Sequence, residues 1–540
     1  MSTAYIVLLI LLIVYIPIWI WTWRRPDDAA RWHLVKYGPC IMIKTQLGMR
    51  TMDRLAAHTR FWRAFGFFSK VVSAVLFFLM MYMLVVAVLA LPQTLSSGSS
   101  VGIEYALAIP GFNPILPLSY GVVALVIAMV IHELGHGIQA RANGVRVKSS
   151  GLLYGVVPLG AFVEPDEDDM QKQPRRAQID VYAAGITMNT ILAVASIAIL
   201  ILACGAVSSD HGNTPGVYYI DAGSPAYEAG IPASALIVGI EEYCEERSEG
   251  YDDRLVLTED EIDSITTTSG TAAYLDCDDL DPTRQYVITY LYHDQTYTTE
   301  PMQIGVYIKA ITSGSPADSA GMEVGDFLYQ IEIDGTTHTI SSSAQFTRLM
   351  ATTSPGEEVT VTTVDVIGDD GTVTTHTYDV TLASNGSIGF LGVSSTTSGM
   401  TFVTPDALMD RATDPFYGAD TPFSYVTSLF SYLSGPFNGM DPVSDDVKWW
   451  YDAPGGDLFW MFVTLMYWLF WLDILLAISN ALPTYILDGG FIFAGGVSWL
   501  LERLGVRDEA RRERMTESVA GSVSTLTLFM FILVLMVMII

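Results

Sequence analysis

Residues 118–140 read LSYGVVALVIAMVIHELGHGIQA, an almost continuously apolar run that ends in a cluster of polar side chains. At 1.5 Å per helical residue, such a run can cross the roughly 30 Å hydrocarbon layer of a membrane. His132 and His136 are four residues apart and so lie on one helix face. A His-Glu-x-x-His helix can hold Zn²⁺ between its imidazoles, and Glu133 is then placed to accept a proton from water at the metal.

A plainer interpretation is that the two histidines only satisfy polar partners in the protein interior. Ionisable groups inside a bilayer are costly and need a compensating partner, most simply a cation, so we favour the metal site. The other six histidines have no metal-ligand spacing, and we expect them to be ordinary polar residues: His33, His58, His211, His293, His338 and His376.

The composition indicates a polytopic α-helical membrane protein, since 51% of the residues are hydrophobic. We expect six membrane spans, at about residues 4–23, 67–92, 118–140, 179–206, 457–481 and 521–540. The first span is followed by Arg24 and Arg25 and has a longer apolar run than a cleaved signal peptide, so we expect it to remain as a span.

The distribution of Lys and Arg predicts the orientation of these spans. Residues 24–70, 141–176 and 501–514 hold 21 of the 28 basic residues, and alternating spans put all three segments on one side. The positive-inside rule makes that side the cytoplasm of a plasma-membrane protein. Both termini and the long segment 208–456 are then predicted to lie outside the cell.

Segment 208–456 carries most of the acidic residues, 39 Asp and Glu against seven Lys and Arg. Its negative charge would repel a phosphate backbone, so we exclude nucleic acid as a partner. We interpret the charge as a solvated external surface, and a dedicated cation-binding role is the alternative. Cys244 and Cys277 are both predicted to be external, where they can either form a disulfide or stay free.

The same segment contains an internal repeat. Gly223-Ser224-Pro225-Ala226 recurs as Gly314-Ser315-Pro316-Ala317, and each copy follows a Gly-Val-Tyr strand and precedes an Ala-Gly pair. With Gly325-Asp326 and the helix and strands expected after them, the order resembles the prokaryotic PDZ domain. That resemblance implies α+β modules that take up extended peptides by strand addition, and modules that act only as steric covers are the alternative.

A third ligand is needed to complete a two-histidine zinc site. We predict that Asp488 supplies it, from the segment Asn480-Ala-Leu-Pro483-Thr-Tyr-Ile-Leu-Asp488-Gly489-Gly490 at the cytoplasmic end of the fifth span. Pro483 ends the helix, and the two glycines let the chain turn back toward the histidines.

The pairing of His-Glu-x-x-His with a later Asn-x-x-Pro-x-x-x-x-Asp-Gly resembles the site-2 protease family, especially its archaeal members. This resemblance implies that His132, His136 and Asp488 bind one Zn²⁺, that Glu133 is the general base, and that Asn480 positions the substrate together with Pro483 and Gly489. Gly185-x-x-x-Asn189 matches a further substrate-positioning element of the family, although Ile186 stands where many members have proline.

Three further expectations concern access to this site. Gly151 to Val163 is apolar but too short to span, so we predict a membrane-associated hairpin within 149–164 that pairs with an unwound substrate; a plain amphipathic loop is the alternative. We expect Gln139, Arg141 and Asn143 to line a hydrated vestibule. Asp473 serves either proton or water access or, more simply, a hydrogen bond within the bundle.

These predictions divide the chain into regions 1–92, 118–206, 208–301, 302–395, 396–456, 457–502 and 521–540. The leading hypothesis is an intramembrane zinc endopeptidase that cuts single-span proteins already trimmed by another protease, with the lipid bilayer as its other partner. A catalytically silent receptor that holds external peptides is the alternative, and a metal transporter is less favoured because it has no use for a general base.

Overall fold

The computed structural model describes residues 3–97, 110–111, 113–155, 158–243, 254–269, 272–368, 371–433, 435 and 443–539. The chain forms two compact units, each described here by itself. A helical unit comprises Met1–Leu202, Leu433–Asp441 and Asp457–Ile540, and a β-rich unit comprises Ala203–Tyr432 and Pro442–Gly456.

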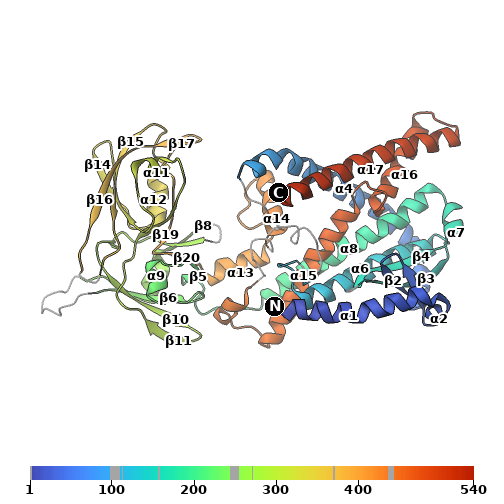
Figure 1. Ribbon diagram of the computed structural model, residues 1–540, viewed down its shortest axis with the longest axis horizontal. Coiled ribbons are helices and arrows are strands. Elements are labelled where there is room, and N and C mark those ends of the chain that lie inside the picture. The colour runs from blue at the N-terminus through green and yellow to red at the C-terminus, as the bar shows by residue number, and fades with distance from the viewer. Residues whose placement is uncertain are drawn as a thin grey trace. The chain divides into compact units, whose positions relative to one another are not determined.

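The helical unit is built from long apolar helices (Figure 1). They are α1 (Thr3–Arg24), α4 (Thr59–Ser97), α6 (Leu118–Ala142), α8 (Arg175–Cys204), α15 (Asp457–Asn480), α16 (Asp488–Arg503) and α17 (Glu509–Ile539). Short helices α2 (Pro26–Arg31), α3 (Met49–Ala56) and α7 (Glu167–Gln171) connect them.

Five helices in the described part of the chain are long and apolar enough to cross a membrane, namely α4, α6, α8, α15 and α17. They correspond to five of the six predicted spans. The sixth prediction falls on α1, whose apolar portion within the searched residues is shorter, Leu9–Arg24.

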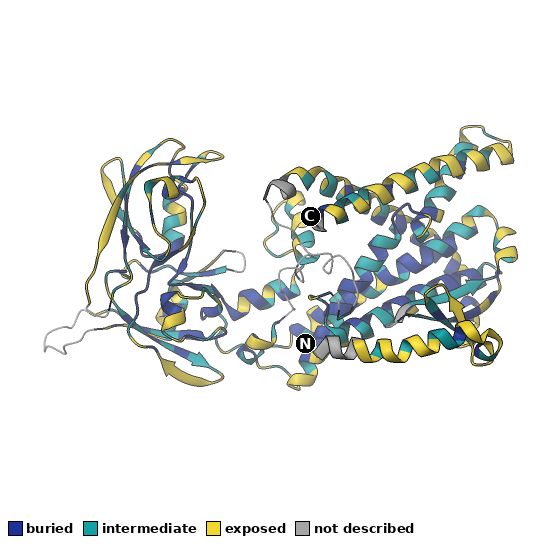
Figure 2. Cartoon of the chain, viewed as in Figure 1, coloured by how far each residue is buried: buried dark blue, intermediate teal, exposed yellow. Residues whose placement is uncertain are grey.

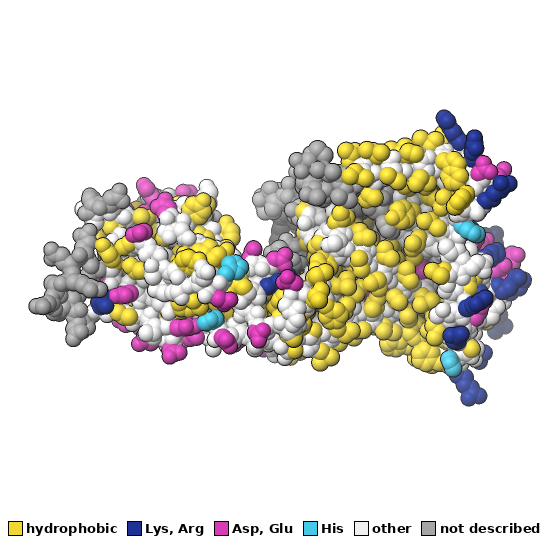
Figure 3. Space-filling view, turned by 90° about the horizontal axis from the view of Figure 1, so that it is seen from below, with side chains coloured by type: hydrophobic (Ala, Val, Ile, Leu, Met, Phe, Trp, Pro, Cys, Tyr) yellow, Lys and Arg dark blue, Asp and Glu magenta, His cyan; other side chains and the backbone are white. Residues whose placement is uncertain are grey.

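Burial separates an inner helix from outer ones. In α15, 61% of the most apolar window is buried, compared with 11% in α4 and in α17 (Figure 2). The outer helices instead expose large apolar side chains such as Phe78 and Leu89, and yellow side chains cover the visible face of the helical unit (Figure 3). Such a surface is suited to lipid, and α15 forms the core of the bundle.

A small antiparallel sheet belongs to the helical unit. Its strands, β1 (Leu34–Tyr37), β2 (Cys40–Thr45), β3 (Val147–Tyr154) and β4 (Pro158–Pro165), lie in the order β1-β2-β3-β4. The segment where we predicted a hairpin therefore forms β3 and β4, with Ser150 opposite Val163. The sequence did not lead us to expect β1 and β2. The glycine at position 151 lets β2 pair with β3, because a side chain there would collide with the carbonyl oxygen of Ile43 in β2.

The β-rich unit is organised around one 14-stranded sheet and contains short helices. Its main path runs β11-β10-β6-β5-β20-β19-β12-β13-β15-β16. The strands are β5 (Gly216–Ile220), β6 (Leu236–Glu242), β7 (Val256–Leu257), β8 (Thr266–Ser269), β9 (Ala272–Leu275), β10 (Tyr286–Tyr292), β11 (Gln295–Thr298), β12 (Val306–Ile311), β13 (Phe327–Ile333), β14 (Thr336–Thr339), β15 (Glu358–Val364), β16 (Thr375–Thr381), β19 (Val393–Thr397) and β20 (Met400–Val403). A separate hairpin pairs β17 (Ala383–Asn385) with β18 (Ile388–Phe390). The helices are α9 (Pro225–Glu228), α10 (Glu259–Ile265), α11 (Pro316–Ala320), α12 (Ser343–Met350), α13 (Pro405–Thr413) and α14 (Pro422–Leu433), with a 3₁₀ turn at Asp445–Trp450.

The repeated sequence produces the same local structure twice. The Ser224 hydroxyl accepts the Tyr227 N–H at the start of α9, and the Ser315 hydroxyl accepts the Asp318 N–H at the start of α11. Each helix is followed by a glycine of positive φ, 75° at Gly230 and 76° at Gly321.

Each repeat has its own apolar core. One contains Ile237 and Tyr286, and the other contains Leu328 and Val361. Strand β20 follows the second repeat in the sequence but pairs with β5 of the first repeat. Its Met400 packs in the core that contains Ile237 and Tyr286. The first core is thus completed by a strand from beyond the second repeat.

The remaining expectations for the β-rich unit have different outcomes. Cys277 is buried, but Cys244 lies outside the described residues, so the proposed disulfide stays a prediction. Acidic side chains are spread over the visible face of the unit (Figure 3). Asp276, after β9, pairs with Arg348 on α12 at 2.9 Å, and this guanidinium lowers the pKa of the Asp276 carboxyl.

Candidate metal centre

The two histidines of α6 and the aspartate at the start of α16 meet inside the helical unit. His132 Nε2 lies 3.1 Å from Asp488 Oδ2, His136 Nε2 lies 3.2 Å from the same oxygen, and the two nitrogens are 3.1 Å apart. Both imidazoles are buried, with 7% and 9% of their surface exposed. Within the described residues, this trio is the group of ligand-type side chains close enough to hold one metal ion.

The spacing of these donors fits zinc. With metal–ligand distances of about 2.0–2.1 Å, two donors of a tetrahedral site lie roughly 3.3 Å apart, close to the observed separations. His136 Nδ1 lies 2.7 Å from the carbonyl oxygen of Val181, to which it can donate, leaving Nε2 free for a metal. Two imidazoles and one carboxylate form a catalytic zinc donor set that leaves a fourth position for water.

The turn between α15 and α16 brings Asp488 to the histidines, as the sequence led us to expect. Helix α15 ends at Asn480, Pro483 is buried in the turn, and α16 begins at Asp488. A side chain at Gly489 or Gly490 would collide with backbone carbonyl oxygens of this turn. Glycine is therefore required for α16 to start so close to the end of α15.

Gly185 brings α8 against the two imidazoles. A Cβ atom at Gly185 would lie 2.9 Å from Cε1 of His132 and even closer to the ring of His136. The Gly-x-x-x-Asn element noted in the sequence thus lies beside the candidate ligands. Asn189, one turn further along α8, is completely buried, and neither of its amide atoms has a hydrogen-bond partner in the described structure.

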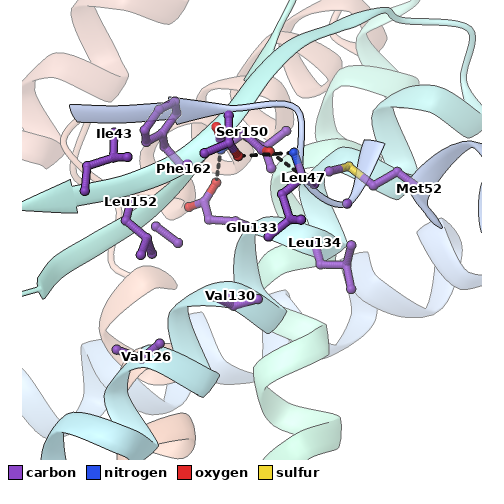
Figure 4. Close-up of a pocket in the computed structure, with 15 residues that line it drawn as sticks. Ile43, Leu47, Met52, Val126, Val130, Glu133, Leu134, Ser150, Leu152 and Phe162 are labelled. Atoms are coloured by element: carbon purple, nitrogen blue, oxygen red, sulfur yellow. Dashed lines mark hydrogen bonds between the residues drawn. The ribbon is translucent and has the colours of Figure 1, made fainter. Parts of the chain in front are cut away.

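Glu133 faces a different environment from the two histidines. Its Oε2 accepts the backbone N–H of Val163 in β4 at 2.9 Å. Glu133 also lines a cavity of about 280 Å³ together with residues of α6, β2, β3 and β4 (Figure 4). Apart from Glu133, the wall is mainly apolar and includes Leu152 and Phe162. The sequence alone did not indicate this contact, because it joins a helix to a strand thirty residues later.

The polar residues expected around the site differ in how far they are buried and in what they contact. Asn480 is half-buried and donates from Nδ2 to the Leu476 carbonyl at 3.0 Å. Gln139 is fully buried and donates to the Trp62 carbonyl, so the prediction that it lines a hydrated vestibule is wrong. Its amide packs between α6 and α4, where the Trp62 carbonyl gives its buried N–H group an acceptor.

Two other vestibule candidates also form internal contacts. Arg141 pairs with Asp53 of α3, and Asn143 donates to the Gln139 carbonyl at the end of α6. Asp473 is completely buried in α15, and its carboxylate oxygens have no hydrogen-bond partner in the part of the chain that the structure describes. The expectation of a bundle hydrogen bond at Asp473 is therefore wrong for this structure.

Comparison with known proteins shows which protein family contains this set of residues. The model of Peptidase family M50 matches residues 120–537, which include both histidines, Glu133 and Asp488. The chain belongs to peptidase family M50. This is the site-2 protease family that the sequence resembles, a family of membrane-bound metalloproteases.

Individual relatives of this M50 family member match over shorter regions. An uncharacterized protein of Methanocaldococcus jannaschii is 31% identical over 29% of this chain and 42% of its own length. A protein of Clostridium acetobutylicum, provisionally named a zinc metalloprotease, is 31% identical over 24% of this chain and 43% of its own. A membrane-bound transcription factor site-2 protease homolog of Arabidopsis thaliana is 26% identical over 24% and 27%. The alignments thus span less than half of each relative.

Proposed function

We propose that this protein is an intramembrane zinc endopeptidase that hydrolyses peptide bonds in or near membrane spans of its substrates. The observation that carries the proposal is the buried trio of His132, His136 and Asp488, with mutual donor distances of 3.1–3.2 Å, in a membrane-type helical unit. We assign one Zn²⁺ to this trio. Bound zinc supplies Lewis-acid activation of water and of the substrate carbonyl.

The chain's own residues then perform the proton transfer and the positioning. Glu133 follows the first ligand in sequence and is the general base that accepts a proton from the attacking water. Its present hydrogen bond to Val163 holds the carboxylate at the edge of β4. We assign substrate positioning to Asn480, at the end of α15, while Pro483, Gly489 and Gly185 shape the space around the ligands.

A helical substrate span must unwind before cleavage, because its carbonyls are engaged in its own hydrogen bonds. Strand β4 is the terminal strand of the small sheet, and it lies next to Glu133. We propose that the unwound substrate adds to this edge as a further strand, which would satisfy its freed backbone groups. The mainly apolar wall formed by β2, β3 and β4 suits a membrane-derived segment.

We further propose a multi-pass protein of the plasma membrane with its active site toward the cytoplasm, as the distribution of Lys and Arg predicts. The two repeats of the β-rich unit would be external PDZ-like domains. Their proposed role is to filter single-span substrates, admitting those that another protease has trimmed. The repeated Ser-capped helices, each following a strand, support this assignment.

Reconstitution of native and Glu133→Gln protein in liposomes with a single-span substrate tests the proposal. We expect the glutamine variant to keep its zinc and to lose about 10³-fold in cleavage rate, because the ligands remain and the base does not. Zinc content measured on the same samples separates loss of chemistry from loss of metal. Cleavage within about tenfold of native would remove Glu133 from the mechanism, whereas no cleavage by the native protein would favour the alternative, a catalytically silent peptide receptor.

A further inference from the structure

Two buried polar groups close to the candidate metal centre lack hydrogen-bond partners among the described residues. One is Nδ1 of His132, and the other is the side-chain amide of Asn189. Buried donors and acceptors are nearly always paired in folded proteins, because an unpaired group loses its hydration without compensation. Unpaired groups of complementary type in neighbouring helices therefore point to a contact that forms when the site is loaded.

Metal binding through Nε2 requires a proton on Nδ1, and this N–H ordinarily donates to a nearby acceptor that fixes the ring. His136 meets this requirement through the Val181 carbonyl, 2.7 Å from its Nδ1. His132 has no equivalent acceptor in the described structure. His132 thus lacks the kind of hydrogen bond that orients the ring of His136.

The geometry of α8 places Asn189 suitably to provide that support. Val181, Gly185 and Asn189 follow one another at four-residue intervals, so they lie on one face of α8. The Val181 carbonyl accepts from His136, and Gly185 lies against both imidazoles, where the nearest atom of His132 is Cε1, between its two ring nitrogens. Helical side chains lean toward the N-terminus of their helix, so Asn189 leans back toward the level of Gly185.

We propose that Asn189 is a positioning residue for His132, accepting the Nδ1–H through Oδ1 directly or through one water molecule. This inference rests on the proposed zinc site. It differs from the substrate-positioning role suggested by the sequence, because Asn189 has no exposed surface in this structure. The consequence is a tighter zinc site, since the imidazole is held in the correct tautomer and orientation.

Zinc affinity of the detergent-solubilised full-length protein tests this role without any measurement of cleavage. We expect Asn189→Leu to weaken zinc binding by about 10- to 100-fold in competition with a chromophoric chelator. Asn189→Asp keeps an acceptor at the same position and should stay within about threefold of native. Thr187→Val is the matched control, because Thr187 is equally buried on α8 and donates to its own helix at Ala183.

Thermal unfolding of the zinc-free protein separates positioning from packing. Asn189→Leu should unfold at or above the native temperature, because it removes a buried unpaired amide, while its gain in unfolding temperature on adding zinc should be smaller than native. Native-like zinc affinity in Asn189→Leu, equal weakening in Asn189→Asp, or a lower zinc-free unfolding temperature in Asn189→Leu would each overturn the inference. Failure of the native chain itself to bind zinc would instead overturn the proposed function.

Discussion

Glu133 Oε2 accepts the backbone N–H of Val163 at 2.9 Å, so the candidate base is attached to the edge of a β-sheet. Val163 lies opposite Ser150 in the pairing of β3 with β4, and β4 is the last strand of that sheet. The N–H that Glu133 holds therefore belongs to the free edge of β4. Under the proposed mechanism, this hydrogen bond holds the base beside the substrate-binding edge.

Replacing Val163 by proline tests this relationship. Val163→Pro removes the N–H but leaves the pairing of β4 with β3, because proline is tolerated where the N–H faces away from the sheet. We expect cleavage to fall by about tenfold or more, since Glu133 loses the hydrogen bond that orients it. Val163→Ala, which keeps the N–H, is the matched control for lost side-chain volume. Equal rates in the two variants would show that the hydrogen bond has no role in catalysis.

Gly185 offers a test of the metal centre through shape alone. Gly185→Ala would place a methyl group 2.9 Å from Cε1 of His132 and closer still to His136, so the rings must shift. We expect zinc affinity to drop by about tenfold or more and the folded state to lose about 1–3 kcal/mol from overpacking. Gly496→Ala is the control, because the structure places nothing within 4 Å of its added methyl group. Isothermal titration of both variants with zinc gives the comparison, and native-like binding by Gly185→Ala would contradict the described packing.

A deletion of the repeats tests the proposed substrate filter. The first core uses β20, so a clean deletion should run from Gly216 to Val403 rather than stop at the end of the second repeat. With a flexible linker in its place, we expect zinc binding and cleavage of a short model span to persist. Discrimination against substrates with bulky external domains should disappear, because exclusion requires a repulsive element. If trimmed and untrimmed substrates are still distinguished, the filter lies elsewhere in the chain.

Single cysteines test the predicted orientation in the membrane. Thr296 on β11 and Arg511 on α17 are both exposed, and the charge distribution places them on opposite sides. In a background without native cysteines, we expect an impermeant thiol reagent to label Thr296→Cys in intact cells and to label Arg511→Cys only after lysis. Labelling of Arg511→Cys in intact cells would reverse the orientation and the cytoplasmic placement of the site.

Much of the candidate site is encoded locally and was predictable. The four-residue spacing of His132 and His136 fixes their common helix face, and apolar runs of sufficient length identify five of the helices. Asp488 was predictable because Pro483 and the two glycines mark a turn next to a span end. Each of these signals lies within one continuous stretch of the sequence.

Only the tertiary structure decided which distant segments meet. Strand β2 pairs with β3 across more than one hundred residues, β20 enters the core of the first repeat, and Val163 binds Glu133. No local pattern encodes these contacts, because strand pairing depends on backbone groups that every residue carries and on space that other helices leave open. For the same reason the sequence shows that Asn189 and Asp473 are polar, while their complete burial without partners follows only from the packing of α8 and α15.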